Sequence, residues 1–314
     1  HIRAGRVAAF LVAGGQGTRL GFDGPKGAFP IGPVSNHSLF QIFAEHLIAS
    51  SRKYQTAIPW LIMTSRENHQ ATLDFFKANG YFGYDPEMLA VFPQNMVPSL
   101  STEGRLVLQS KCEIFRNPDG HGGSLNAIAD SGALARLERD GIETISYFQV
   151  DNPLVNIIDP VFIGFHRMEG GEVSSKGILK TDPAERVGVF VRFDNEATGI
   201  VEYSDIAPER QEARDECGRL FFCMGNPAIH LFGVDFIRRL NGGGFDLEFH
   251  VARKKILSYR REGWKEIDGF KFEKFVFDAI IDPASSAFYA MAAFHVASAA
   301  YRAFRAHNAY AAAL

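Results

Sequence analysis

The chain has 314 residues, of which 46% are hydrophobic, and a formal net charge of −3. This apolar content is sufficient for a large buried core, and the length predicts one or two domains. The slightly acidic balance excludes the basic surface typical of nucleic-acid-binding proteins, and the absence of any run of 18 apolar residues excludes a membrane-spanning helix.

The first predicted element is a buried strand over residues 7–13 that leads into a glycine-rich loop over residues 14–21. Glycines let a backbone approach an anion closely and turn its N–H groups toward it. Arg19 and Lys26 add two positive charges to this loop and its continuation. We therefore predict that the loop binds the triphosphate of a nucleotide. The alternative is a tight strand-to-helix turn with two surface cations.

The loop differs from the two commonest glycine motifs. Leu20 stands where the dinucleotide fingerprint G-x-G-x-x-G needs its last glycine. Lys26 is followed by Gly27, whereas a Walker loop needs serine or threonine at that position. A nicotinamide-dependent oxidoreductase therefore becomes a minor alternative, supported only by the order of strand, glycine loop and helix.

After this loop, predicted helices and strands alternate through the N-terminal half. Helices are predicted over residues 38–53, 66–79 and 124–140, and strands over residues 60–64, 89–93 and 144–150. This alternation predicts an α/β fold with a mixed, mostly parallel sheet flanked by helices.

The second half has a different pattern, which predicts mixed α+β structure on the same sheet. Strands are predicted over residues 187–193 and 199–203 as a hairpin, continued by 219–223, followed by a helix over 245–254 and a short element near 274–277. We assign residues 1–282 to one domain. The alanine-rich residues 283–314 predict a C-terminal segment of one or two helices.

Polar groups follow several predicted strands, and in open α/β sheets ligands bind at the carboxyl ends of strands. They lie in the segments 94–98, 118–123 and 151–152. Asp151 offers a hard carboxylate oxygen that suits Mg²⁺, and the loop around His121 could close over a base or a sugar. The alternatives are a capped turn at Asp151 and a histidine that bonds a neighbouring loop.

These motifs together resemble those of the UDP-sugar pyrophosphorylases, which are UTP–sugar-1-phosphate uridylyltransferases. The stretch 14–21 is most similar to the eukaryotic-type UDP-N-acetylglucosamine pyrophosphorylases. Further matching segments follow in the family's order over residues 59–65, 94–98, 119–123, 150–152, 201–204, 225–230 and 270–278. The resemblance covers about residues 7–282 and implies a Rossmann-like sheet of the nucleotide-diphospho-sugar transferase type.

The resemblance also implies roles for individual residues. Those expected to act in catalysis by neutralising phosphate charge are Arg19, Lys26 and Lys271. Those expected to bind the nucleotide are Ala13, Gly14, Gly15, Gln94, Gly120 and Asp151, with Gln94 and Gly120 on uracil and Asp151 near Mg²⁺. Those expected to surround the sugar are His121, Glu202, Tyr203 and Asn226.

The implied activity joins UTP and a sugar 1-phosphate into a UDP-sugar, foremost UDP-N-acetylglucosamine, with release of pyrophosphate. The alternatives are a UDP-glucose or UDP-galactose type of enzyme and a non-catalytic nucleotide-sugar-binding protein. Two departures from the family bear on this choice. His121 stands where acetylhexosamine enzymes usually have asparagine and glucose-type enzymes have histidine, and no S-P-x-K-N segment, with its sugar-phosphate lysine, follows Asp278.

Three cysteines, at positions 112, 217 and 223, show no C-x-x-C spacing. This pattern predicts a reducing, cytoplasmic compartment and no zinc site. The expected partners are UTP and a sugar 1-phosphate, without nucleic acid or membrane, and the sequence does not predict an oligomeric state.

Overall fold

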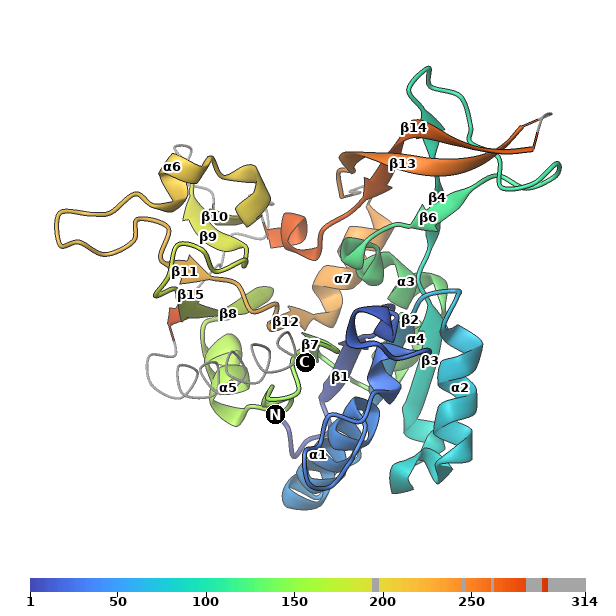
Figure 1. The fold of residues 1–314 in the computed structure, drawn as a ribbon. Helices are drawn as coiled ribbons and strands as arrows, with labels where there is room; N and C mark the ends of the chain where they lie inside the picture. The colour runs from blue at the N-terminus through green and yellow to red at the C-terminus, as the bar shows by residue number, and fades with distance from the viewer. Residues whose placement is uncertain (194–197, 244–246, 261–262, 281–289, 293–314) are drawn as a thin grey trace.

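The computed structural model describes residues 1–193, 198–243, 247–260, 263–280 and 290–292, and it is built on one large mixed sheet (Figure 1). The strand order is β10-β9-β11-β8-β12-β7-β1-β2-β3, with β15 beside β8. The strands are β1 (Val7–Val12), β2 (Trp60–Thr64), β3 (Leu89–Pro93), β7 (Thr144–Gln149), β8 (Val173–Leu179), β9 (Val189–Arg192), β10 (Thr198–Val201), β11 (Met224–Gly225), β12 (His230–Gly233) and β15 (Ala290–Ala292).

The two halves of this sheet differ in strand direction. In the N-terminal half, β7, β1, β2 and β3 are all parallel. β12 then runs antiparallel to both β7 and β8, and the pairs from β8 to β10 are antiparallel as well. The predicted α/β class with a mixed sheet is confirmed, and the carboxyl ends of β1, β2, β3 and β7 meet at one edge.

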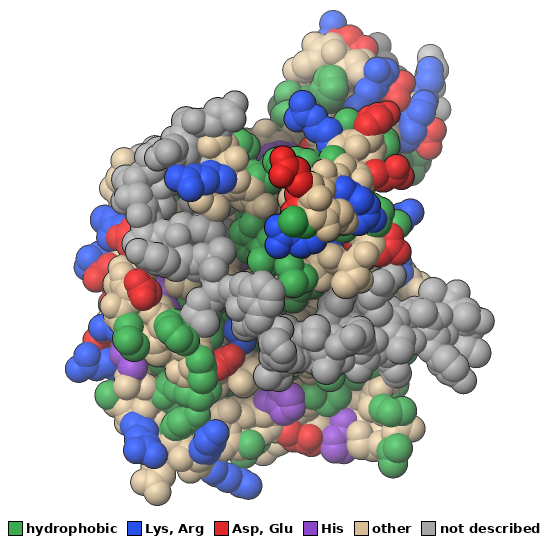
Figure 2. Space-filling model, turned by 90° about the vertical axis from the view of Figure 1, so that its left-hand side faces the viewer, with side chains coloured by type: hydrophobic (Ala, Val, Ile, Leu, Met, Phe, Trp, Pro, Cys, Tyr) green, Lys and Arg blue, Asp and Glu red, His purple; other side chains and the backbone are tan. Residues whose placement is uncertain are grey.

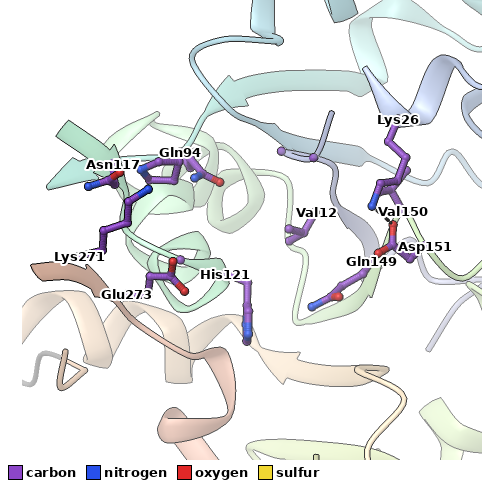
Figure 3. Close-up of a pocket in the computed structure, with 14 residues that line it drawn as sticks. Val12, Lys26, Gln94, Asn117, His121, Gln149, Val150, Asp151, Lys271 and Glu273 are labelled. Carbon is purple, nitrogen blue, oxygen red and sulfur yellow. Dashed lines mark hydrogen bonds and ion pairs between the residues drawn. The ribbon is translucent and has the colours of Figure 1, made fainter. Parts of the chain in front are cut away.

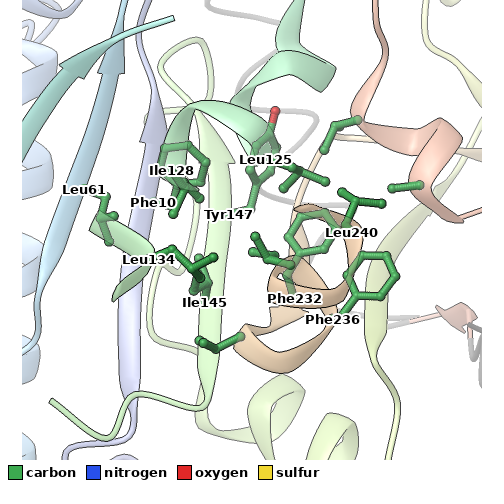
Figure 4. Packing of buried hydrophobic residues seen from close by; sticks show 14 of the residues in the cluster. Phe10, Leu61, Leu125, Ile128, Leu134, Ile145, Tyr147, Phe232, Phe236 and Leu240 are labelled. Atoms are coloured by element: carbon green, nitrogen blue, oxygen red, sulfur yellow. The ribbon is translucent and has the colours of Figure 1, made fainter. Parts of the chain in front are cut away.

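Helices cover both faces of the sheet. They are α1 (Leu39–Tyr54), α2 (His69–Ala78), α3 (Ser124–Asp130), α4 (Ala133–Arg139), α5 (Pro160–Met168), α6 (Pro208–Gln211) and α7 (Val234–Gly242). Side chains of α1, α2 and α5 join the buried cluster on one face, and those of α3, α4 and α7 join the cluster on the other (Figure 4). β1 supplies both clusters, since Phe10 points to one and Leu11 to the other, which explains why this strand is apolar at every position.

The prediction of one continuous helix over residues 124–140 is wrong. Two helices, α3 and α4, occupy this range, and they are separated at Ser131 and Gly132. Gly132 has φ 78°, a left-handed conformation that glycine adopts readily and that interrupts the helical hydrogen bonds. Ser124 is the first residue of α3 and not its cap, because Gly123 holds the N-cap position.

The predicted helix over residues 245–254 is also wrong within the described residues. From His250 the chain forms β13 (His250–Arg260), which pairs antiparallel with β14 (Gly263–Glu273), and β14 pairs with β5 (Leu100–Ser101). Several residues of this stretch favour a helix, but eleven residues of β13 pair with residues of β14. Pairing between strands commonly outweighs the local preference of the residues. The hairpin projects from the body as an arm on which basic and acidic side chains are mixed (Figures 1 and 2).

Other predicted elements lie near their expected places. The hairpin of residues 187–193 and 199–203 is β9 and β10, paired antiparallel. The continuation predicted at 219–223 is displaced, because the short strand β11 begins at Met224. Residues 274–277 run into a 3₁₀ helix, η7 (Val276–Ile280), and not a strand.

The C-terminal segment predicted as helical over residues 283–314 lies almost entirely outside the described residues. Its described part, β15, is a strand parallel to β8, so the helix prediction is wrong at Ala290–Ala292. In the described part of the chain, no helix is both long enough and apolar enough to cross a membrane. The cytoplasmic location stays a prediction.

Two buried histidines in the body of the fold make its stability depend on pH. Burial lowers the pKa of His166 to about 4 and that of His230 to about 3. In the unfolded chain a histidine takes up its proton near pH ~6.5. Between these values the unfolded state binds more protons than the folded state, so acid favours unfolding.

We therefore expect the free energy of unfolding to fall as the pH drops from about 6.5 toward 4, with each such histidine contributing up to about 1.4 kcal/mol per pH unit. H166Q should reduce this slope, measured by urea denaturation at several pH values. The exposed His46 of α1 supplies the control H46Q, which removes an imidazole without removing a buried one. An unchanged slope in H166Q would contradict the assignment.

Candidate functional site

The glycine-rich loop after β1 is held by one buried side chain, that of Asn68. Its Nδ2 donates to the carbonyl oxygens of Ala13 (3.1 Å) and Gly15 (3.2 Å). Its own place is fixed by reciprocal bonds with Ser65, from Ser65 N–H to Asn68 Oδ1 and from Asn68 N–H to Ser65 Oγ. Because the loop carbonyls turn toward Asn68, the loop N–H groups are directed elsewhere.

Three successive N–H groups of this loop, those of Gly14, Gly15 and Gln16, donate to no other group in the described chain. On either side of them the loop is hydrogen-bonded, with Ala13 N–H on Met63 and Lys26 N–H on the Gly15 carbonyl. Consecutive free N–H groups in a tight loop form an anion-binding concavity. This arrangement supports the predicted phosphate role of the loop.

Gln94 lies directly against Gly14. A Cβ atom at Gly14 would come within 2.8 Å of Gln94 Oε1, so glycine is needed there for the amide to approach the loop. Gln94 is only 7% exposed, and its backbone N–H is fixed on the Thr64 carbonyl at the end of β2. Its side-chain amide has no hydrogen-bond partner among the described residues, which leaves it available to a ligand.

Lys26 and Asp151 form an ion pair with Nζ to Oδ1 at 2.8 Å. Lys26 begins a 3₁₀ helix, η2 (Lys26–Ala28), and Asp151 follows β7, so two elements distant in sequence bring the charges together. The lysine side chain is 21% exposed and the aspartate 58%. Both residues are predicted to lie near the phosphates, and the structure shows that they contact each other.

The second glycine loop is docked on the chain that follows β14. Gly122 N–H donates to the Lys274 carbonyl (2.8 Å), and Lys274 N–H donates to the Asp119 carbonyl (2.7 Å). A Cβ atom at Gly122 would lie 2.6 Å from backbone carbon atoms of Lys274 and Phe275, so only glycine fits. These glycines therefore serve chain-to-chain packing, and the Gly122 N–H group is not free for a ligand.

His121 begins the short 3₁₀ helix η5 (His121–Gly123) in this loop, and its ring is stacked on Phe275 with centroids 5.2 Å apart. Burial, and then the charge of His250, lower the pKa of His121 to about 4, so the ring is neutral near pH 7. Nδ1 accepts a hydrogen bond from the Val276 N–H at 3.2 Å. The proton of the neutral ring is therefore on Nε2, which is left as a donor.

These parts surround one cavity of about 300 Å³ (Figure 3). Its lining residues are Val12, Gly14, Gly15, Lys26, Gln94, Asn117, Pro118, Gly120, His121, Gln149, Val150, Asp151, Lys271 and Glu273. Lys26 and Asp151 lie at one end, and Gln94, Asn117, Lys271 and Glu273 lie at the other, with Val12, Gln149 and His121 between them. One end of the cavity therefore has the Lys26–Asp151 ion pair beside the free N–H groups of Gly15 and Gln16, and the other end has amide groups together with Lys271 and Glu273.

Lys271 lies at the end of the cavity away from Lys26. It is carried by β14, its Nζ lies 6.0 Å from the centroid of the Phe115 ring, and Figure 3 shows it beside Asn117. The family resemblance implies that this lysine reaches the phosphates, whereas the structure places it near Gln94.

Five other predicted residues do not line this cavity. Ala13, the residue after β1, is fully buried, and Arg19 is exposed on the 3₁₀ helix η1 (Gly17–Leu20). Glu202, Tyr203 and Asn226 lie on the antiparallel half of the sheet, at the ends of β10 and β11. Their predicted roles stay predictions.

Two of the predicted sugar residues, Glu202 and Asn226, do lie close together around Gly188. Asn226 N–H donates to the Gly188 carbonyl at 2.7 Å, and a Cβ atom at Gly188 would lie 3.3 Å from Glu202 Oε1. Burial, and then the charge of Asp205, raise the pKa of Glu202, while His250 lowers it. His250 also contacts Phe275, with ring centroids 4.3 Å apart, so this wall is connected to His121 through two aromatic rings.

Sequence reasoning missed Asn68, Asn117, Gln149 and Glu273. A signal existed for Asn68, since it follows β2 at the edge where the other polar groups lie, and for Glu273, which alternates with Lys271 on one strand. Asn117 and Gln149 had no such signal. Asn117 is 5% exposed, and its Nδ2 donates to Ser99 Oγ, which leaves its Oδ1 toward the cavity.

The carboxylate of Asp151 can bind a magnesium ion only when a ligand supplies further oxygen atoms. Among the described residues no group of three or more His, Cys, Asp and Glu side chains could hold a metal. Asp151 is one exposed carboxylate at the cavity, with Oδ1 on Lys26 and Oδ2 remaining. Mg²⁺ commonly takes one or two protein carboxylates and completes its shell with phosphate oxygens and water.

Known proteins resemble this chain over most of its length. A UDP-N-acetylhexosamine pyrophosphorylase-like protein 1 from Xenopus tropicalis is 40% identical, over 88% of this chain and 56% of its own. The UDP-N-acetylglucosamine pyrophosphorylase of Saccharomyces cerevisiae is 38% identical, over 88% of this chain and 60% of its own. The crystal structure of the uridine diphosphate N-acetylglucosamine pyrophosphorylase from Trypanosoma brucei superimposes with a TM-score of 0.82 at 32% identity, covering 93% of this chain and 60% of that chain.

The chain therefore spans less than two thirds of the length of these relatives. The profile of the family described as UTP–glucose-1-phosphate uridylyltransferase matches residues 3–262. This match covers the strand order, both glycine loops and most of the cavity lining. The resemblance seen in the sequence is confirmed, and the chain belongs to the UTP–glucose-1-phosphate uridylyltransferase family.

Proposed function

We propose that the protein transfers a uridylyl group from UTP to a sugar 1-phosphate, forming a UDP-sugar and pyrophosphate. The observation that carries this proposal is the cavity with two unlike ends. One end has Lys26 and the free N–H groups of Gly15 and Gln16, which suit a triphosphate, and the other has the Gln94 amide against Gly14, which suits a base. Family membership supports UTP and a sugar 1-phosphate as the substrates.

The reaction needs little proton transfer. A phosphate oxygen of the sugar 1-phosphate is already anionic, and it attacks the α-phosphorus in line with the departing pyrophosphate. Catalysis then depends on positioning and on neutralising the charge that grows on the leaving group. Lys26 and the free N–H groups of the first glycine loop are placed for this task, and Arg19 would have to move to contribute.

The sugar is best assigned as N-acetylglucosamine, because the relatives from Saccharomyces cerevisiae and Trypanosoma brucei are named as UDP-N-acetylglucosamine pyrophosphorylases. The Nε2–H of His121 can donate to a sugar oxygen, and Glu202 and Asn226 form a polar wall nearby. His121 in place of asparagine favours a glucose-type substrate as the second candidate. Both candidates use the same cavity and the same transfer chemistry.

We propose Mg²⁺ as the cofactor, held by Asp151 together with phosphate oxygens of UTP. When bound, the ion would supply positive charge at the phosphates. A phosphate that binds Lys26 competes with the carboxylate of Asp151 for the same ammonium group. Nucleotide binding would therefore replace the Lys26–Asp151 ion pair with a contact between Lys26 and a phosphate. The ion pair thus holds Lys26 in the phosphate end before the nucleotide arrives.

Lys26→Ala should lower kcat by about 10²–10³, the scale of one lost transition-state donor. Pyrophosphate release from UTP in a coupled assay measures this loss. The exposed Lys53 near the end of α1 gives the matched control K53A, which should retain activity. Near-normal turnover in K26A would remove the lysine from the mechanism.

Gln94 should make the enzyme prefer uridine, because one amide can both donate to a carbonyl and accept from the N3–H of uracil. Wild-type kcat/KM should be much higher for UTP than for ATP. Q94A should lower kcat/KM for UTP by about tenfold or more, the scale of a lost specific hydrogen bond. Equal use of UTP and ATP by the wild type would refute base reading at this position, and Q70A on α2 serves as the control.

Asp151→Asn should change how UTP binding depends on Mg²⁺. Calorimetry without metal should show UTP binding about fivefold tighter in D151N, because an ion pair with an exposed partner is worth up to about 1 kcal/mol and no longer competes. The added affinity from Mg²⁺ should shrink. Weaker metal-free binding in D151N would contradict the exchange of contacts at Lys26.

A further inference from the structure

Glu273 is a cavity-lining carboxylate to which neither the family resemblance nor the mechanism above gives a task. It is the last residue of β14 and pairs with His250, the first residue of β13. The next residue, Lys274, is fixed to the second glycine loop through its N–H and its carbonyl. A Cβ atom at Gly120 would lie 3.2 Å from the Glu273 Cβ, so the residue is held from two sides.

The charge of Glu273 has no ion-pair partner within the described residues. Lys271, two residues earlier on the same strand, places its ammonium group over the Phe115 ring at 6.0 Å from the centroid. A partly buried carboxylate without a cation stays favourable only if hydrogen-bond donors face it. Water can supply these donors in the cavity before a ligand binds, and a nucleotide that displaces this water would have to replace them.

The position of Glu273 restricts which part of a nucleotide can lie beside it. Figure 3 shows Glu273 near Lys271 and on the opposite side of the cavity from Lys26 and Asp151. Each end has one lysine and one carboxylate, so the free N–H groups of Gly15 and Gln16 beside Lys26 distinguish the two ends, and they favour a triphosphate that points away from Glu273. The nucleoside is then the part that lies at the Glu273 end.

Within a uridine nucleoside only a few groups can donate to a carboxylate. The uracil edge presents two carbonyl acceptors and one N–H, and the amide of Gln94 is placed to take that N–H. The remaining donors are the 2′ and 3′ hydroxyl groups of the ribose. A hydroxyl that donates to a carboxylate makes a short, charge-assisted bond about twice as strong as a neutral one.

We propose that Glu273 accepts hydrogen bonds from the ribose hydroxyls of the nucleotide and makes the site select ribonucleotides over 2′-deoxyribonucleotides. This inference rests on the proposed function, because it takes the nucleotide to lie with its triphosphate on Lys26. It adds a specificity-determining residue on the β13–β14 arm. The arm thereby contributes to nucleotide selection at a site otherwise built at the edge of the large sheet.

The test compares UTP with 2′-deoxy-UTP by calorimetry in the presence of Mg²⁺, so that it does not depend on turnover. The wild type should bind UTP at least tenfold more tightly than 2′-deoxy-UTP, the scale of a hydrogen bond to a charged group. E273A should lose more affinity for UTP, which has both hydroxyls, than for 2′-deoxy-UTP, which keeps only the 3′ hydroxyl, and this difference brings the ratio toward one. The isosteric E273Q should give an intermediate ratio.

Glu266 provides the matched control, because it is an exposed glutamate on the same strand and does not line the cavity. E266Q should show the wild-type ratio. Two results would overturn the ribose assignment while leaving the proposed function intact. In one, E273Q loses affinity for UTP and for 2′-deoxy-UTP equally. In the other, the ratio of the two affinities is unchanged in E273Q and the KM for the sugar 1-phosphate is raised. Failure of the wild type to bind UTP would instead overturn the proposed function, and UTP binding without pyrophosphate release would overturn only its catalytic part.

Discussion

The site depends first on the two hydrogen bonds from Asn68 to the carbonyl oxygens of Ala13 and Gly15. They turn one side of the first glycine loop toward the protein, and the N–H groups of Gly14 to Gln16 are left free as a consequence. A loop that used these N–H groups in its own turns would have no place for a phosphate. Asn68 is 1% exposed, so the bonds form in a dry environment where a lost partner is costly.

A second constraint connects this loop to the C-terminal half of the described chain. The second glycine loop packs against the backbone at Lys274 and Phe275, and through it the β13–β14 arm is positioned at the cavity. The stack from His121 to Phe275 to His250 continues the contact toward Glu202. The nucleotide end and the predicted sugar wall are thus parts of one packed arrangement, although they come from segments far apart in sequence.

The sequence predicted well those features that depend on local patterns. The parallel strands are mostly apolar and bounded by turn residues, and the glycine loop, Lys26, Gln94 and Asp151 are found at the carboxyl edge that the α/β rule indicates. The β13–β14 hairpin was missed because its residues favour a helix locally and become strands only by pairing with each other. The break at Gly132 was missed because one glycine in a helical pattern is often tolerated. Glu273 alternates with Lys271 along the chain, but only the pairing of β13 with β14 brings it to the cavity, and Asn117 lies on a short strand, β6 (Arg116–Pro118), that the sequence pattern did not indicate.

The cavity is proposed to transfer a uridylyl group from UTP to a sugar 1-phosphate. The most direct measurement is pyrophosphate release from UTP and Mg²⁺ with a panel of the 1-phosphates of N-acetylglucosamine, N-acetylgalactosamine, glucose and galactose. Pyrophosphate should be released, with N-acetylglucosamine 1-phosphate as the preferred acceptor. Binding of UTP with no release of pyrophosphate for any of the four sugars would contradict it and identify a protein that binds the nucleotide without catalysis.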